Sequence, residues 1–144
     1  MYFMLDYFRK KQARLINSTP TEFIRETYLK PVMSANRLVG LIGHRGVGKT
    51  TLLLQYLKKN FSMSECLYVS ADDIHITNTT LYDLTDDFFA LGGKVIVFDE
   101  IHKYSDWARE LKNIYDSFPG MQIRFSGSSM LNIIHEAYDL SRRC

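Results

Sequence analysis

Residues 43–50 read GHRGVGKT and match the pattern GxxxxGK[ST] at every position. The motif follows an apolar run, residues 38–42, and precedes an amphipathic pattern at residues 49–60. Glycines at these positions let backbone N–H groups turn inward around phosphate oxygens, and the start of the following helix adds partial positive charge. The motif therefore predicts a phosphate-binding loop between a buried strand and a helix.

This loop assigns chemistry to individual side chains. Lys49 is expected to reach the β and γ phosphates, and the Thr50 hydroxyl is expected to bind Mg²⁺. The side chains of His44 and Arg45 are expected to face solvent, with a contact from Arg45 to phosphate or to a partner as the alternative. An NKxD motif, which would read guanine, does not occur, and this favours ATP. The predicted nucleotide-binding residues are Gly43, His44, Arg45, Gly46, Val47, Gly48, Lys49, Thr50 and Thr51.

From residue 37 onward, four apolar runs alternate with helical patterns. The predicted strands are residues 38–42, 66–70, 95–98 and 123–126, and the predicted helices are residues 49–60, 80–91, 106–118 and 130–138. The strands are continuously apolar, which is typical of a parallel sheet with helices on both faces. The fold class is therefore α/β with three layers, in a domain over residues 37–144. Residues 1–36 form an N-terminal helical segment, with helices predicted at 2–15 and 21–30.

An acidic pair follows the third predicted strand in the sequence VIVFDE, which has the Walker B form. Asp99 ends a buried strand, where ligands bind in doubly wound sheets, and is expected to hold Mg²⁺ through water molecules. Glu100 is expected to orient and deprotonate the water that attacks the γ-phosphate, which favours hydrolysis over transfer. Asp72 and Asp73, which follow the second strand, are interpreted as turn residues.

The fourth predicted strand ends in small hydroxyl residues. Ser126 is predicted to sense the γ-phosphate, because it would lie between the two strands that carry the motifs above. Ser128 and Ser129 are alternative caps for the helix that follows. The predicted catalytic residues are Lys49, Glu100 and Ser126, and the predicted metal ligands are Thr50 and Asp99.

Composition limits the partners and the compartment. The net charge of +2 is too small to indicate a nucleic-acid or membrane partner, although it leaves nucleic acid open. The two cysteines show no zinc or disulfide spacing, and no apolar stretch reaches membrane-spanning length. A cytoplasmic protein is expected.

Taken together, these segments resemble the AAA-type ATPases of the STAND and archaeal ATPase groups, in particular the AAA domain proteins that carry a C-terminal DUF4143 region. The likeness runs from about residue 37 to the end and includes FDEIHKY at 98–104 and DLSRR at 139–143. It implies binding of ATP and Mg²⁺ and a core sheet of order 5-1-4-3-2, of which strands one to four are placed here. Because such proteins continue beyond the Arg142–Arg143 pair, a truncated chain is expected.

Three functions stay open from the sequence. The leading hypothesis is an ATP-hydrolysing switch, read by the missing C-terminal region or by another protein subunit. In that case Arg142 or Arg143 is a candidate arginine finger, or else both solvate the end of a helix. The alternatives are a P-loop kinase, which would transfer phosphate to an acceptor, and a non-catalytic ATP-binding interaction module.

Overall fold

The computed structural model describes residues 3–21, 32–42 and 48–127. Within these ranges the chain forms a four-stranded parallel sheet of order β1-β4-β3-β2. The strands are β1 (Leu38–Ile42), β2 (Cys66–Ser70), β3 (Val95–Asp99) and β4 (Gln122–Gly127). The predicted parallel α/β fold is confirmed, and the strand order is that of strands one to four in the expected 5-1-4-3-2 core.

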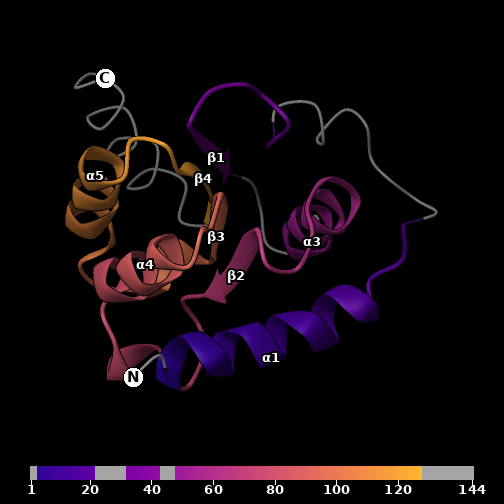
Figure 1. Ribbon diagram of the computed structural model, residues 1–144, viewed down its shortest axis with the longest axis horizontal. Helices are drawn as coiled ribbons and strands as arrows, with labels where there is room; N and C mark the ends of the chain where they lie inside the picture. Colours follow the sequence, from indigo (N-terminus) through magenta and orange to yellow (C-terminus); the bar gives the residue numbers. More distant parts are fainter. Residues whose placement is uncertain (1–2, 22–31, 43–47, 128–144) are drawn as a thin grey trace.

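Helices cover both faces of this sheet and complete three layers (Figure 1). Helix α3 (Lys49–Asn60) lies on one face, where Leu53 packs with Val95 and Val97 of β3. Helices α4 (Leu81–Ala90) and α5 (Trp107–Ser117) lie on the other face, where Leu84 packs with Ile96. Since successive residues of β3 serve opposite faces, the whole strand is buried, which explains its unbroken apolar sequence.

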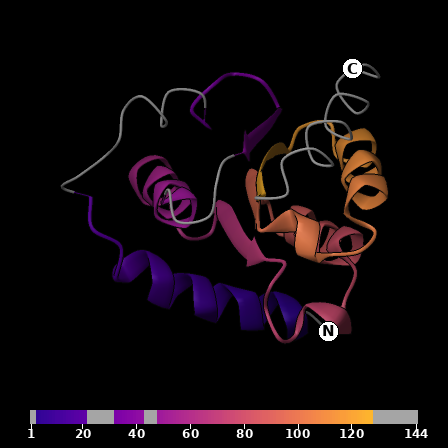
Figure 2. The same ribbon diagram turned by 180° about the vertical axis from the view of Figure 1, so that it is seen from behind.

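Helix α1 (Phe3–Asn17) runs along the β2 side of the sheet, as both ribbon views show (Figures 1 and 2). Phe8 joins the core beneath α4 and α5, and Ile16 joins the core beneath α3. The predicted helix at residues 2–15 is thus present. The predicted helix at residues 21–30 lies outside the described residues except for Thr21, which is not helical, and the predicted helix at 130–138 lies wholly outside them. Within the described part of the chain, no helix has the length and apolarity needed to cross a bilayer.

A buried arginine fixes the segment that leads into β1. Arg124 of β4 is 1% exposed and its guanidinium donates to the carbonyl oxygens of Val32 at 2.6 Å and Ser34 at 2.8 Å. It also donates to Asn36 and Arg37 at 3.1 and 3.2 Å. A planar fork of donors suits this task, because it serves several backbone acceptors at once. The entry to the strand before the phosphate loop is therefore tied to the centre of the sheet.

Candidate functional site

The described part of the phosphate loop begins at Gly48, which has φ 80° and ψ 25°. Such left-handed geometry is strained for a residue with a Cβ, so glycine suits this position. Helix α3 starts at the next residue, and the side chain of Lys49 is largely buried while Thr50 and Thr51 are exposed. Residues 43–47 lie outside the described residues, as do Ser128, Ser129, Arg142 and Arg143.

The structure brings the start of α3 and the end of β3 together. The Thr50 hydroxyl donates to Oδ2 of Asp99 at 2.6 Å, although the two residues are 49 positions apart. Asp99 is 2% exposed and lies at the carboxyl end of β3. The Thr50 hydroxyl at the start of α3 and the Asp99 carboxylate at the end of β3 are oxygen ligands of the kind that Mg²⁺ prefers.

Two further hydroxyls hold the Asp99 carboxylate from the neighbouring strands. Tyr68 of β2 donates to Oδ2, and Ser126 of β4 donates to Oδ1. Strand register explains this convergence, since β2 pairs with β3 at Ser70 and Asp99, and side chains alternate along each strand. Tyr68, Asp99 and Ser126 therefore share the face of the sheet that α3 covers.

Glu100 follows with an unusual backbone. Its φ is 54° and its ψ is 43°. Among the described residues other than glycine, Glu100 alone has a positive φ. This geometry costs about 1–3 kcal/mol and tends to persist at functional sites where surrounding contacts enforce it. The Ser126 hydroxyl is such a contact, because it accepts the Glu100 N–H at 3.0 Å. Ser126, which is fully buried, thus connects both residues of the acidic pair.

The Glu100 side chain is partly exposed and has a histidine beside it. Its Oε2 lies 3.4 Å from Nε2 of His102, in the short helix η2 (Ile101–Lys103). Glu100 is 25% exposed at the side chain, so solvent reaches it while Asp99 stays enclosed. The two carboxylates therefore differ in environment: Asp99 is fixed by hydroxyls, and Glu100 faces the open side.

The residues of the site fit a magnesium ion held mainly by phosphate and water. Among the described residues, no group of three or more His, Cys, Asp or Glu side chains could form a metal cage. Mg²⁺ in phosphate sites is usually held by one or two protein oxygens, several waters and the substrate phosphates. Thr50 and Asp99 supply that number of protein oxygens.

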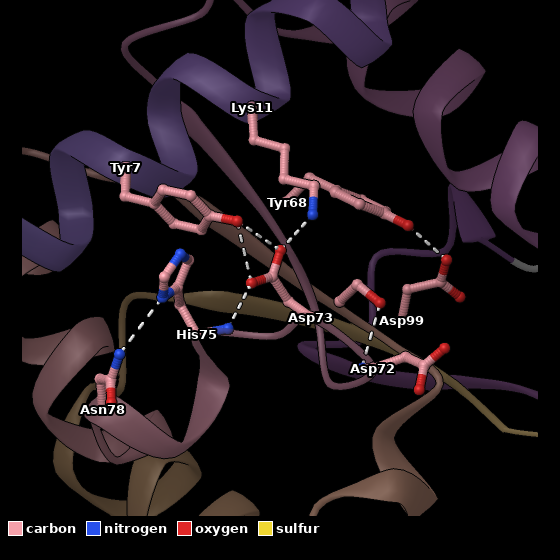
Figure 3. Close-up of polar contacts among 9 residues, drawn as sticks. Tyr7, Lys11, Tyr68, Asp72, Asp73, His75, Asn78 and Asp99 are labelled. Atoms are coloured by element: carbon pink, nitrogen blue, oxygen red, sulfur yellow. Dashed lines mark hydrogen bonds and ion pairs between the residues drawn. The ribbon is translucent and has the colours of Figure 1, made fainter.

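A second polar cluster lies beside the site, between α1 and the loop after β2 (Figure 3). Asp73 accepts hydrogen bonds from Tyr7 and Lys11 of α1 and from the His75 N–H, the last at 2.8 Å. The His75 contact agrees with the interpretation of Asp73 as a turn residue. A cavity of about 270 Å³ adjoins the cluster and reaches Tyr68.

Sequence reasoning left both Tyr68 and His102 out of the predicted site. Strand alternation could have found Tyr68, because it stands two residues before Ser70 and so on the same face as Asp99. Nothing comparable identifies His102, since its approach to Glu100 depends on the fold of η2.

A protein-family model described as AAA domain matches residues 35–144 of the chain. No curated protein matches the sequence.

Proposed function

Since the chain belongs to the AAA domain family of nucleotide-binding P-loop proteins, we propose that it binds ATP with Mg²⁺ and hydrolyses it as a nucleotide-driven switch. The observation that carries the proposal is the 2.6 Å contact between the Thr50 hydroxyl and the Asp99 carboxylate. This contact joins the helix that follows the phosphate loop to the strand that carries the acidic pair. A site for a phosphate chain and a divalent cation is thereby supported at one end of the sheet.

The proposed roles follow from charge and position. Lys49 would neutralise the β and γ phosphates, together with backbone N–H groups of the loop. Thr50 and Asp99 would hold Mg²⁺, which when bound neutralises charge that develops on the phosphate oxygens. Residues 43–48 and Thr51 complete the proposed nucleotide-binding set.

Glu100 is the residue that favours water as the acceptor. Its carboxylate is partly exposed and next to the enclosed Asp99, so it is available to orient a water and take its proton. The strained backbone of Glu100, with φ 54°, sets the direction in which its side chain leaves the backbone. Ser126 would support both acidic residues through its hydroxyl, and its predicted contact with the γ-phosphate is a further part of the proposal.

The nucleotide state is proposed to be read by a further C-terminal region or by another protein subunit. An arginine finger from such a partner raises phosphoryl-transfer rates by about 10³–10⁵, so the chain alone is expected to turn over slowly. Arg142 and Arg143, which belong to this chain, stay proposed candidates for an arginine finger that acts in a neighbouring subunit.

The test measures phosphate release from ATP by the purified chain, with Mg²⁺ or with EDTA. Release should require Mg²⁺, and Glu100→Gln should lower it by about 10²–10⁴ while nucleotide affinity is kept. Lys49→Ala should weaken ATP binding by about 1.5–3 kcal/mol, and Lys59→Ala, on the exposed end of the same helix, is the matched control.

Three results would contradict the proposal. Phosphate release by Glu100→Gln at the parental rate would remove Glu100 from the reaction. Transfer of the γ-phosphate to an added acceptor, in place of water, would identify a kinase, and binding without any turnover would identify a non-catalytic module.

A further inference from the structure

Tyr68 contacts the carboxylate that the proposed function assigns to Mg²⁺. The residue is 5% exposed, its side chain lies on the α3 face of β2, and its hydroxyl points at Asp99 (Figure 3). It donates to Oδ2, the same oxygen that accepts the Thr50 hydroxyl, while Ser126 donates to Oδ1. The orientation of the Asp99 carboxylate is therefore set from both sides.

The Tyr68 hydroxyl donates its hydrogen to the Asp99 carboxylate. An ionised carboxylate can accept hydrogen bonds but cannot donate them, so Tyr68 is the donor in this bond. If Thr50 turns its hydroxyl to a metal ion, Tyr68 is the remaining described donor to Oδ2.

The backbone of Tyr68 is held in turn by α1. Oε1 of Gln12 accepts the Tyr68 N–H at 2.6 Å, and Nε2 of Gln12 donates to the Cys66 carbonyl at 3.1 Å. Strand β2 is the outer strand of the described sheet, so these two backbone groups face away from β3 and need other partners. Gln12 is 1% exposed and supplies both partners with one side-chain amide.

We propose that Tyr68 is a positioning residue for Asp99, and that α1 acts on the magnesium–nucleotide site through the chain of contacts from Gln12 to Tyr68 to Asp99. This inference rests on the proposed function. It assigns the N-terminal helix a role in nucleotide binding, although α1 is about fifty residues away in sequence from β2 and lies outside the segment that matches the AAA domain family. A shift of α1 would move the backbone of Tyr68 and release Oδ2 of Asp99.

The test titrates a fluorescent ATP analogue against the full chain, once with Mg²⁺ and once with EDTA, and takes the ratio of the two affinities. Tyr68→Phe should lower this ratio about tenfold and leave the EDTA affinity unchanged, because one charge-assisted hydrogen bond is lost. Tyr56→Phe is the matched control, since Tyr56 is a buried tyrosine of the same core whose ring lies beside Arg124. Its ratio should stay within about twofold of the parent.

The role of α1 is tested with Gln12→Leu and the double variant. Gln12→Leu should lower the ratio in the same direction, and adding it to Tyr68→Phe should cause no further loss, because both changes act through one contact. If the losses in this affinity ratio add up in the double variant, the proposed action of α1 through Tyr68 is overturned. Thermal unfolding of each variant identifies those that bind poorly because they have lost the fold, and only folded variants are compared.

The outcomes separate this inference from the proposed function. A parent chain whose affinity does not respond to Mg²⁺ would overturn the proposed function and, with it, the role of Tyr68. A parent that responds, with an equal response in Tyr68→Phe, would overturn the role of Tyr68 alone.

Discussion

Replacing Ser126 with alanine removes one oxygen that serves both acidic residues. In the folded chain this hydroxyl donates to Oδ1 of Asp99 and accepts the Glu100 N–H at 3.0 Å. Ser126 is 0% exposed and Asp99 is 2% exposed, so water has little room to replace the missing group. The substitution therefore leaves two polar groups of the site short of a partner.

The size of the effect follows from these two contacts. A hydrogen bond to a charged group contributes about 1.5–3 kcal/mol, and an unsatisfied buried N–H costs about 1–3 kcal/mol. Partial relaxation reduces the sum, so we expect the free energy of unfolding to fall by about 2–4 kcal/mol. Total stabilities of about 5–15 kcal/mol are usual for single domains, so the variant should still fold at 25 °C.

Urea unfolding followed by tryptophan fluorescence measures this loss. The chain has one tryptophan, Trp107, which is 6% exposed and lies 6.3 Å from the Phe125 ring next to Ser126 in β4. The slope of the transition should stay constant and the midpoint should fall. Ser70→Ala is the matched control, since its hydroxyl accepts the Asp72 N–H at 3.2 Å at the end of the neighbouring strand. A Ser126→Ala midpoint equal to that of Ser70→Ala would refute the account of Ser126 as the support of the acidic pair.

Three other predictions test parts of the same structure. Glu100→Gly should raise the free energy of unfolding by about 0.5–1 kcal/mol, because glycine adopts positive φ without strain; a less stable variant in urea would show that the backbone of Glu100 is not strained. Arg124→Lys should lower it by about 2–4 kcal/mol, since one ammonium cannot serve the carbonyls of Val32, Ser34 and Asn36 together; an unchanged melting temperature would contradict this. The third prediction concerns pH. Burial alone would raise the pKa of Asp73, but hydrogen bonds from Lys11, the His75 N–H and Tyr7 outweigh burial and hold this pKa below its ordinary value of 3.8. The hydrogen bond between Lys11 and Asp73 also raises the pKa of Lys11 above its ordinary value of 10.5. The contribution of Asp73 to the free energy of unfolding is therefore complete above pH 3.8 and is lost as the pH falls through its lowered pKa. The contribution of Lys11 is complete below pH 10.5 and is lost as the pH rises through its raised pKa. The melting temperatures of the parent and Asp73→Asn should differ at neutral pH and converge in strong acid; a constant difference would show that the carboxylate of Asp73 does not tie α1 to the loop.

The strands and their flanking helices could be predicted from the sequence because burial on both faces leaves a clear signal. Strand β3 was expected at residues 95–98 and spans Val95–Asp99, and α3 was expected at the residues it occupies. The small differences lie at the ends of elements, where the apolar pattern stops before the hydrogen bonding does. The proximity of Thr50 and Asp99 also follows from sequence, since the motifs fix which strand ends must meet.

Contacts made across the sheet edge could not be predicted in the same way. Gln12 lies on a helix whose apolar pattern predicts only which side is buried. In the sequence, nothing distinguishes its side-chain amide from that of any other polar residue. Its bond to the Tyr68 N–H joins residues 56 positions apart and depends on how α1 docks. The left-handed backbone of Glu100 gives no signal either, because glutamate carries no preference for positive φ.

The strand order explains why one carboxylate collects so many contacts. Because β4 lies between β1 and β3, the residue that ends β4 on the α3 face is placed between the phosphate-loop strand and Asp99, and here that residue is Ser126. Because β2 lies on the other side of β3, Tyr68 approaches Asp99 from the opposite direction. The start of α3 brings Thr50 to the same carboxylate. Each of these hydroxyls comes from a different element, so a movement of the phosphate loop, of β4 or of the α1-bound strand β2 must change the setting of Asp99.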